Sequence, residues 1–64
     1  MNTFDAVMIA EGVHDASEQE TINAWQHLID TGTCWVLQGW FGRQANHLIN
    51  EGICNPAGEM NNEN

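Results

Sequence analysis

The side chains best suited to chemistry in this sequence are three histidines and two cysteines: His14, His27, His47, Cys34 and Cys54. Structural zinc sites place such residues in short motifs, such as two cysteines separated by two residues, because one ion must be reached by several side chains at once. No pair of these residues has a spacing of that kind. We therefore expect no metal site and no other cofactor, and we interpret both cysteines as reduced, buried apolar residues.

Catalysis has little support in the sequence. A cysteine nucleophile needs a histidine base at hydrogen-bond distance, and nothing in the spacing of these residues places two of them together. With 64 residues, the chain also has little room for a concave substrate pocket of the usual size, which is roughly 300 Å³ or more. We expect a protein that is not an enzyme.

The charge balance excludes two classes of partner. Nine Asp and Glu face one Arg and no Lys, for a net charge of −8. Nucleic acids and anionic membranes are both bound largely through Lys and Arg, so we expect no direct binding to either. A protein partner with a basic surface is favoured instead. Because the chain also lacks a long apolar run and a basic N-terminal leader, we expect a cytoplasmic protein.

Four carboxylates lie close together in the sequence and form a candidate acidic face: Glu11, Asp15, Glu18 and Glu20. Such a face can present negative charge where a DNA duplex presents phosphates, and so inhibit a nucleic-acid enzyme. The same residues are also typical of a solvated surface that caps a helix. Both interpretations stay open at this point.

The stretch LQGWFGRQ, residues 37–44, is the strongest candidate for a binding surface. It combines adjacent aromatics, two glycines and the only Lys or Arg of the chain, and Trp and Arg are enriched at the centres of protein interfaces. The glycines would let another helix approach closely, although a helix break at Gly39 is an alternative. With the preceding tryptophan, the candidate protein-binding residues are Trp35, Gln38, Gly39, Trp40, Gly42 and Arg43.

Two questions about this stretch concern where its side chains point. Trp25 belongs to another predicted helix, and a core this small houses about two tryptophans. One of Trp35 and Trp40 is then expected to be partly exposed, where it could contact a partner protein or a second copy of the chain. The alternative is that all three tryptophans pack in the core. Arg43 in turn either contacts a partner or pairs within the chain with Asp30 or Glu51.

Hydrophobic periodicity and helix-end signals predict an all-α fold, a small three-helix bundle. The predicted helices cover residues of about 4–11, 17–31 and 33–51. Each is followed by a glycine, which accepts the left-handed conformation in which helices commonly end. Residues 1–54 form the single domain, and residues 55–64, which are polar and aperiodic, are expected to be a flexible tail.

The predicted helices have recognisable caps and buried faces. Thr3 is expected to cap the first helix, and Ser17 with Glu20 to form a capping box on the second. The expected buried stripe of the first helix is Phe4, Val7 and Met8. That of the second is Ile22, Trp25, Leu28 and Ile29.

The segment from residue 27 to residue 54 resembles a family of short, uncharacterised bacteriophage proteins. The resemblance rests on a Leu-Ile-x-Thr-Gly turn followed by Trp, Leu-Gln-Gly, an aromatic residue, Gly-Arg, Ala and a closing Leu-Ile and Gly. Those positions are Leu28, Ile29, Thr31, Gly32, Trp35, Leu37, Gln38, Gly39, Phe41, Gly42, Arg43, Ala45, Leu48, Ile49 and Gly52. The sequence departs from the pattern at Gln44, where Thr is usual, and at Phe41, often Tyr.

The resemblance implies a phage origin and a role in the cytoplasm of the host cell, and it implies no particular activity. Our leading hypothesis is a small acidic protein that binds and modulates a host protein with a basic surface. The alternatives are a DNA-mimic inhibitor of a host nucleic-acid enzyme and a self-associating structural protein, in which the aromatic residues lie in a homodimer interface.

Overall fold

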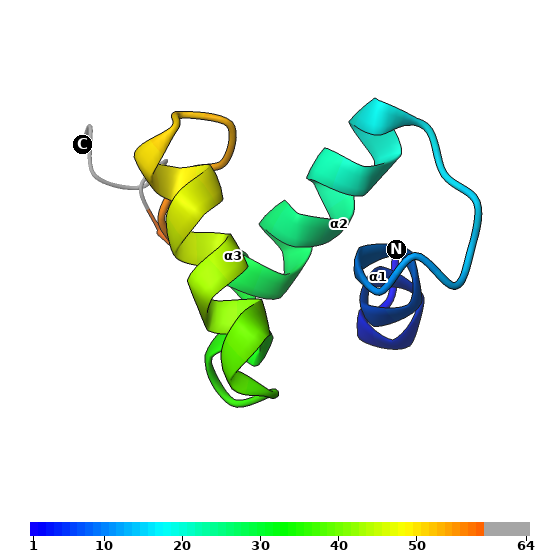
Figure 1. The fold of residues 1–64 in the computed structure, drawn as a ribbon, viewed down its shortest axis with the longest axis horizontal. Coiled ribbons are helices and arrows are strands. Elements are labelled where there is room, and N and C mark those ends of the chain that lie inside the picture. The colour runs from blue at the N-terminus through cyan, green and yellow to red at the C-terminus, as the bar shows by residue number, and fades with distance from the viewer. Residues whose placement is uncertain (59–64) are drawn as a thin grey trace.

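The computed structural model describes residues 1–58. These residues form three α-helices, α1 (Thr3–Ala10), α2 (Glu18–Asp30) and α3 (Gly39–Asn50), and a short 3-10 helix, η1 (Thr33–Trp35). No strand occurs within this range, so the predicted all-α fold is confirmed. Helix α2 runs through the centre of the molecule, with α1 on one side of it and α3 on the other (Figure 1).

The start of α2 follows the sequence prediction, whereas the start of α1 does not. Ser17 Oγ accepts a hydrogen bond from the backbone N–H of Glu20 at 3.1 Å, and Glu20 Oε1 accepts one from the N–H of Ser17 at 2.8 Å. In α1 the cap is Asn2, whose Oδ1 accepts from the N–H of Asp5 at 2.8 Å. The predicted cap Thr3 is wrong because the helix begins one residue earlier than expected, so that Thr3 is its first residue. The hydroxyl of Thr3 lies 3.1 Å from Nε2 of His27 on α2.

The prediction that a left-handed glycine follows each helix is confirmed. Gly12, Gly32 and Gly52 have φ angles of 79°, 77° and 77°, in the left-handed region that Gly adopts without steric cost. After α1, the N–H of Val13 bonds back to the carbonyl of Met8 at 2.9 Å. The same bond follows α3, so both helices end with their last carbonyls satisfied by the chain that follows.

The third predicted helix is interrupted, which corrects its predicted range of 33–51. Residues 33–35 form η1, and α3 begins only at Gly39. Gln38 is extended, with φ −58° and ψ 153°, and precedes the helix without a side-chain cap. The alternative of a break at Gly39 is therefore correct. The break allows η1 to fold back over the first turns of α3, and Gly is poorly suited to hold a continuous helix there.

Helix α1 reaches the core through a smaller side chain than its sequence pattern predicts. Ala6 is its one fully buried residue, whereas Phe4 is 68% exposed. Ala6 on α1 and Ala24 on α2 are both inaccessible, and side chains this small let two helices pack closely. Phe4 lies two residues from Ala6, about 200° around the helix, so it points to the opposite side. The predicted stripe is wrong at Phe4, while Val7 and Met8 are half-buried.

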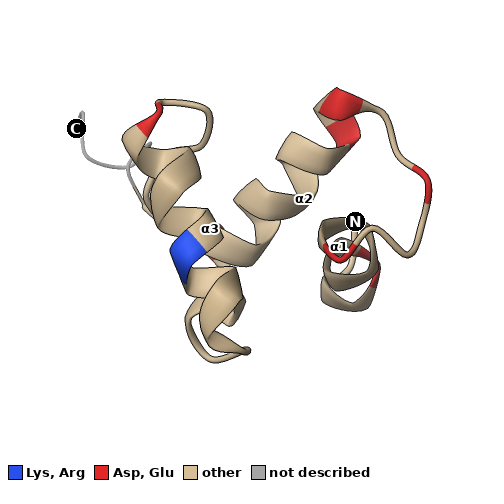
Figure 2. Cartoon of the chain, viewed as in Figure 1, with Lys and Arg blue, Asp and Glu red and all other residues tan. Residues whose placement is uncertain are grey.

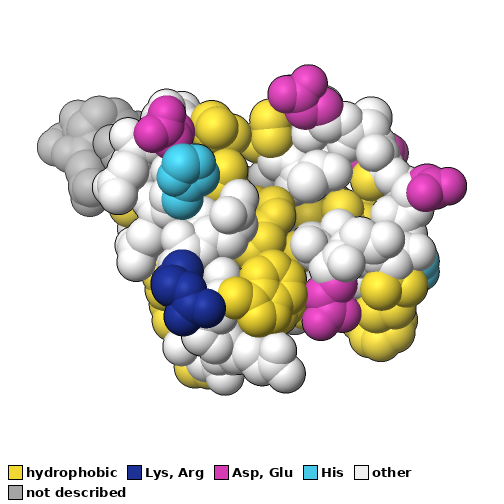
Figure 3. Space-filling model, viewed as in Figure 1, with side chains coloured by type: hydrophobic (Ala, Val, Ile, Leu, Met, Phe, Trp, Pro, Cys, Tyr) yellow, Lys and Arg dark blue, Asp and Glu magenta, His cyan; other side chains and the backbone are white. Residues whose placement is uncertain are grey.

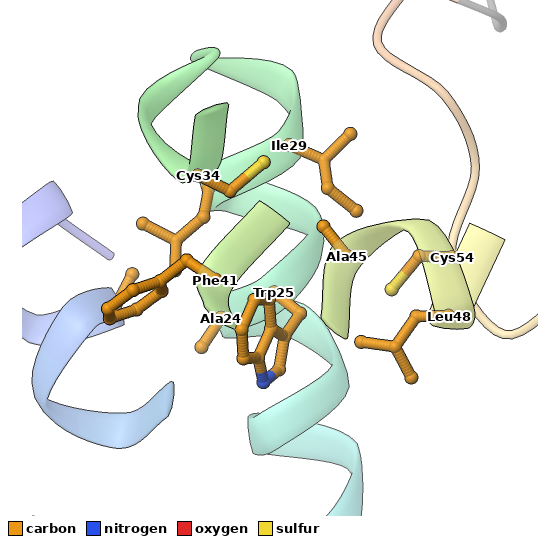
Figure 4. Close-up of a cluster of buried hydrophobic side chains, with 10 residues drawn as sticks. Ala24, Trp25, Ile29, Cys34, Phe41, Ala45, Leu48 and Cys54 are labelled. Atoms are coloured by element: carbon orange, nitrogen blue, oxygen red, sulfur yellow. The ribbon is translucent and has the colours of Figure 1, made fainter. Parts of the chain in front are cut away.

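The core lies mainly between α2, η1 and α3, where apolar side chains converge (Figure 4). Its buried members are Ala6, Ala24, Trp25, Leu28, Ile29, Cys34, Phe41, Ala45, Leu48 and Cys54. The predicted stripe of α2 is confirmed, because Trp25, Leu28 and Ile29 are buried and Ile22 packs against them.

The segment after α3 returns to α2. Cys54 is buried, with Sγ 3.9 Å from the carbonyl of Ile22. The amide of Gln26 then pairs with the backbone of Asn55: Nε2 donates to its carbonyl at 2.8 Å, and Oε1 accepts from its N–H at 2.9 Å. Asn55, predicted as the start of the flexible tail, is thus held on α2. Residues 59–64 of that predicted tail lie outside the described residues.

Among residues 1–58, none of the helices combines the length and the apolar character that crossing a bilayer requires.

Candidate functional site

Two of the predicted binding residues are engaged within the chain. Trp40 stacks on Phe41, with ring centroids 3.9 Å apart, and meets the edge of Trp25 at 6.2 Å. Its indole Nε1 donates to Oε1 of Gln38 at 3.2 Å. This aromatic cluster attaches α3 to α2, and such ring pairs contribute about 0.5–1.5 kcal/mol beyond the area they bury. Trp40 and Gln38 therefore serve mainly to hold the start of α3.

Trp35 has the opposite placement. It is 46% exposed, whereas Trp25 is 4% exposed. The prediction that one of Trp35 and Trp40 is partly exposed is therefore confirmed for Trp35, and the alternative of three core tryptophans is wrong. Val36, the next residue, is 81% exposed. Two adjacent large apolar side chains thus reach solvent, Trp35 at the end of η1 and Val36 in the turn that leads to α3.

The two glycines of α3 have different neighbours. A Cβ on Gly42 would lie 3.5 Å from Cε3 of Trp35 and 3.9 Å from the carbonyl oxygen of Cys34. Gly42 therefore lies beneath the Trp35 ring, and the close approach is made by η1 of the same chain. A Cβ on Gly39 would lie 3.2 Å from Nη1 of Arg43, so the guanidinium extends back along α3 toward Gly39.

Arg43 carries the single positive charge from Lys or Arg, on the surface of α3 (Figure 2). The internal pairing considered from the sequence, with Asp30 or Glu51, does not form: within residues 1–58 no carboxylate oxygen lies within 4.0 Å of a guanidinium nitrogen. Arg43 is exposed. The charge is thus accessible to another molecule.

We call the accessible part of this region the aromatic patch, defined as Trp35, Val36, Gly39 and Arg43. It differs from the predicted set by gaining Val36 and by losing three residues: the partly buried Trp40, the covered Gly42, and Gln38, which is exposed but whose Oε1 is hydrogen-bonded to Trp40. Sequence reasoning missed Val36 because it falls inside the predicted third helix of about residues 33–51. A signal was present in the sequence: the apolar residues at helical spacing in this segment are Leu37, Phe41, Ala45 and Leu48, and Val36 lies outside that series.

The four carboxylates of the predicted acidic face are all exposed: Glu11, Asp15, Glu18 and Glu20. They lie at the end of α1, in the connection to α2 and in the first turn of α2, far from Arg43 (Figure 2). Glu20 also closes the capping box. The acidic face and the aromatic patch are therefore separate surfaces.

The cysteines lie in the core and are protected there. Cys34 is 1% exposed and Cys54 is 2% exposed. Burial raises the pKa of both thiols, because a thiolate is poorly solvated inside the protein. The carboxylate of Asp30 raises the pKa of Cys54 further, while a backbone hydrogen bond partly offsets the effect at Cys34. Neither thiol is placed to act as a nucleophile.

Metal-capable side chains do not gather in the part of the chain that the structure describes. No group of three or more His, Cys, Asp or Glu there could hold an ion. His27 instead bonds to Thr3, which connects α1 to α2.

Fold and surface together define a small all-α domain that presents an exposed aromatic patch. The chain belongs to the family described as a domain of unknown function (DUF7417), whose model matches residues 5–64. The resemblance to a family of uncharacterised proteins is thereby confirmed. No curated protein and no solved structure matches the chain.

Proposed function

We propose that this protein is a non-enzymatic binding module that recognises a partner protein through the aromatic patch and modulates it. The observation that carries the proposal is the exposure of Trp35 and Val36, at 46% and 81%. Apolar side chains that adjoin one another in solvent are favourable to cover, because covering them removes apolar surface from water.

The patch is already ordered, which favours affinity. The Trp35 ring lies over Gly42, where an added Cβ would be 3.5 Å from Cε3 of the ring, and η1 is held by the buried Cys34 beside Trp35. A side chain that is fixed before binding loses little further freedom when a partner covers it. Arg43 adds a directional group, since its planar guanidinium can donate two hydrogen bonds to one carboxylate or to backbone carbonyls.

The expected partner is a host protein with a basic surface. The net charge of −8 speeds encounter with such a surface and slows encounter with acidic ones. The resemblance to phage proteins supports a phage origin and a role in the host cytoplasm. Direct binding to nucleic acid or to an anionic membrane is disfavoured by the shortage of Lys and Arg.

Affinity capture from host lysate with mass spectrometry tests this proposal. The change is Val36→Gln combined with Arg43→Ala, two exposed positions whose replacement leaves the core intact. We expect recovery of the partner to fall at least tenfold, as for residues at the centre of an interface. The matched control is Asn46→Ala combined with Asn50→Ala, two exposed polar positions of α3 outside the patch.

The proposal fails if the double variant, with an unchanged circular dichroism spectrum, still recovers the partner as the natural chain does. Sedimentation at high micromolar concentration tests self-association. A dimer that the same double variant dissociates would identify the patch as a homodimer interface instead.

The exposure of all four carboxylates of the acidic face favours a second candidate function, a DNA-mimic inhibitor of a host nucleic-acid enzyme. This function predicts inhibition that falls steeply with salt. Replacing Glu11, Asp15 and Glu18 by their amides would abolish it, whereas Val36→Gln would leave it unchanged.

A further inference from the structure

Helix α1 has more apolar surface than the rest of the chain covers. Its sequence, TFDAVMIA, has Asp5 as its one charged residue, and helices that are apolar on most sides are normally buried on most sides. In this fold α1 packs on α2 through Ala6, and its outer side remains open. Phe4 is 68% exposed and Val13, three positions after the last residue of α1, is 59% exposed.

The exposed Phe4 and Val13 flank a third apolar residue, the half-buried Met8. Phe4 and Met8 are four residues apart, so they lie one above the other on the same face of α1. Val13 joins them because its N–H bonds to the carbonyl of Met8 at 2.9 Å, which folds the chain back over the helix end. We call Phe4, Met8 and Val13 the α1 strip. Figure 3 shows yellow side chains at the surface over α1, with magenta ones beside them.

The α1 strip is distinct from the aromatic patch. Helix α1 lies on one side of α2, whereas η1 and α3 lie on the other (Figure 1). We therefore treat the strip and the patch as two separate surfaces.

The charges around the strip specify its occupant. Glu11 lies seven residues after Phe4 and therefore on the same face, and Asp15 follows in the exposed connection. We propose that the α1 strip docks a basic amphipathic helix of a partner protein, with apolar residues against Phe4, Met8 and Val13 and with Lys or Arg against the carboxylates. An α-helix of about two turns matches the length of α1.

A second copy of the chain is a poor occupant. Each copy has a net charge of −8 and one Arg, which lies on α3 and not on α1. Two α1 strips face to face would bring Glu11 and Asp15 of both copies together with no cation from Lys or Arg to offset them. The like charges oppose that contact.

The test uses a synthetic helical peptide of about 15 residues, with Leu at positions i, i+3, i+4 and i+7 and Lys elsewhere. The matched control peptide has Glu in place of each Lys. Each is titrated into the isotope-labelled full chain, and amide shifts are followed by NMR. We expect the Lys peptide to bind with shifts centred on Phe4, Met8 and Val13, and the Glu peptide not to bind.

Variants separate this site from the aromatic patch. Phe4→Ala should weaken binding of the Lys peptide about tenfold. Glu11→Gln with Asp15→Asn should weaken it and reduce its salt dependence. Val36→Gln should leave it unchanged. The proposal is overturned by absence of binding, by shifts centred on Trp35, by equal affinity of the Phe4→Ala chain, or by a homodimer that Phe4→Ala dissociates.

Discussion

Replacing Gly42 by Ala is expected to stabilise the protein, although Gly42 lies directly beneath the ring of Trp35. A Cβ at this position would lie 3.5 Å from Cε3 and 3.8 Å from Cζ3 of that ring. These are ordinary van der Waals distances, so a methyl group fits without displacing the indole. Gly42 is also in the helical part of α3, at a negative φ that alanine shares.

The magnitude follows from helix propensity. Glycine within a helix is less favourable than alanine by about 0.5–1 kcal/mol, mainly because it loses more backbone freedom on folding. The Gly42→Ala chain should therefore gain about that much stability. For a domain of about 60–100 residues, 1 kcal/mol corresponds to roughly 4–8 °C in melting temperature.

Thermal unfolding followed by circular dichroism measures this gain. The matched control is Gly52→Ala, because Gly52 has a φ of 77° and, among residues 1–58, no atom beyond its chain neighbours would lie within 4 Å of a Cβ there. Alanine at residue 52 meets open space but a strained backbone, so the melting temperature should fall. The two substitutions are chemically identical and should change stability in opposite directions.

A lower melting temperature for Gly42→Ala would refute this reasoning. It would mean that η1 approaches α3 more closely than the distances above, and that the fold itself requires a glycine there. A higher melting temperature would show that the fold does not require Gly42.

Two further predictions concern contacts of the core and its edge. Gln26→Ala removes both hydrogen bonds to the backbone of Asn55 and should lower the free energy of unfolding by about 1–2 kcal/mol. Hydrogen exchange at the Asn55 amide should accelerate in this variant. Unchanged exchange would contradict the pairing. Burial raises the pKa of Cys34 and Cys54 above the usual value of about 8.5, so the folded state keeps these protons to higher pH than the unfolded state does. This stabilisation is complete below about pH 8.5 and is lost as the pH rises through the pKa values of the folded state. Urea unfolding at pH 7 and at about pH 9.5 should therefore show a lower free energy of unfolding at the higher pH. Equal stability at the two pH values would contradict the burial argument.

Much of the fold could be predicted because its signals are local. The capping box of Ser17 and Glu20 depends on residues three apart, and a left-handed glycine ends a helix through bonds within one turn. The period of apolar residues in α2 likewise identifies its buried face without knowledge of the neighbours. From these local features the sequence correctly predicts three helices and their ends, apart from the cap of α1 and the start of α3.

The candidate site could be predicted only in part, for a physical reason. Trp35 and Trp40 have the same type and lie five residues apart in one apolar stretch, so composition and period cannot tell which is exposed. Which of the two tryptophans is buried depends on the break before Gly39 and on the rings of Trp25 and Phe41 that contact Trp40. The ring of Trp25, on another helix, meets Trp40 only in the folded chain.

The sequence by itself determined the local structure, that is, which segments are helical and where most of them end. It also determined the negative net charge, which disfavours nucleic acid as a partner. Only the tertiary structure decided that Phe4 and Trp35 face solvent, that Trp40 joins the core and that Arg43 stays unpaired by the carboxylates of residues 1–58. Helix signals act within a few residues, whereas the exposure of a side chain depends on which distant segment packs against it.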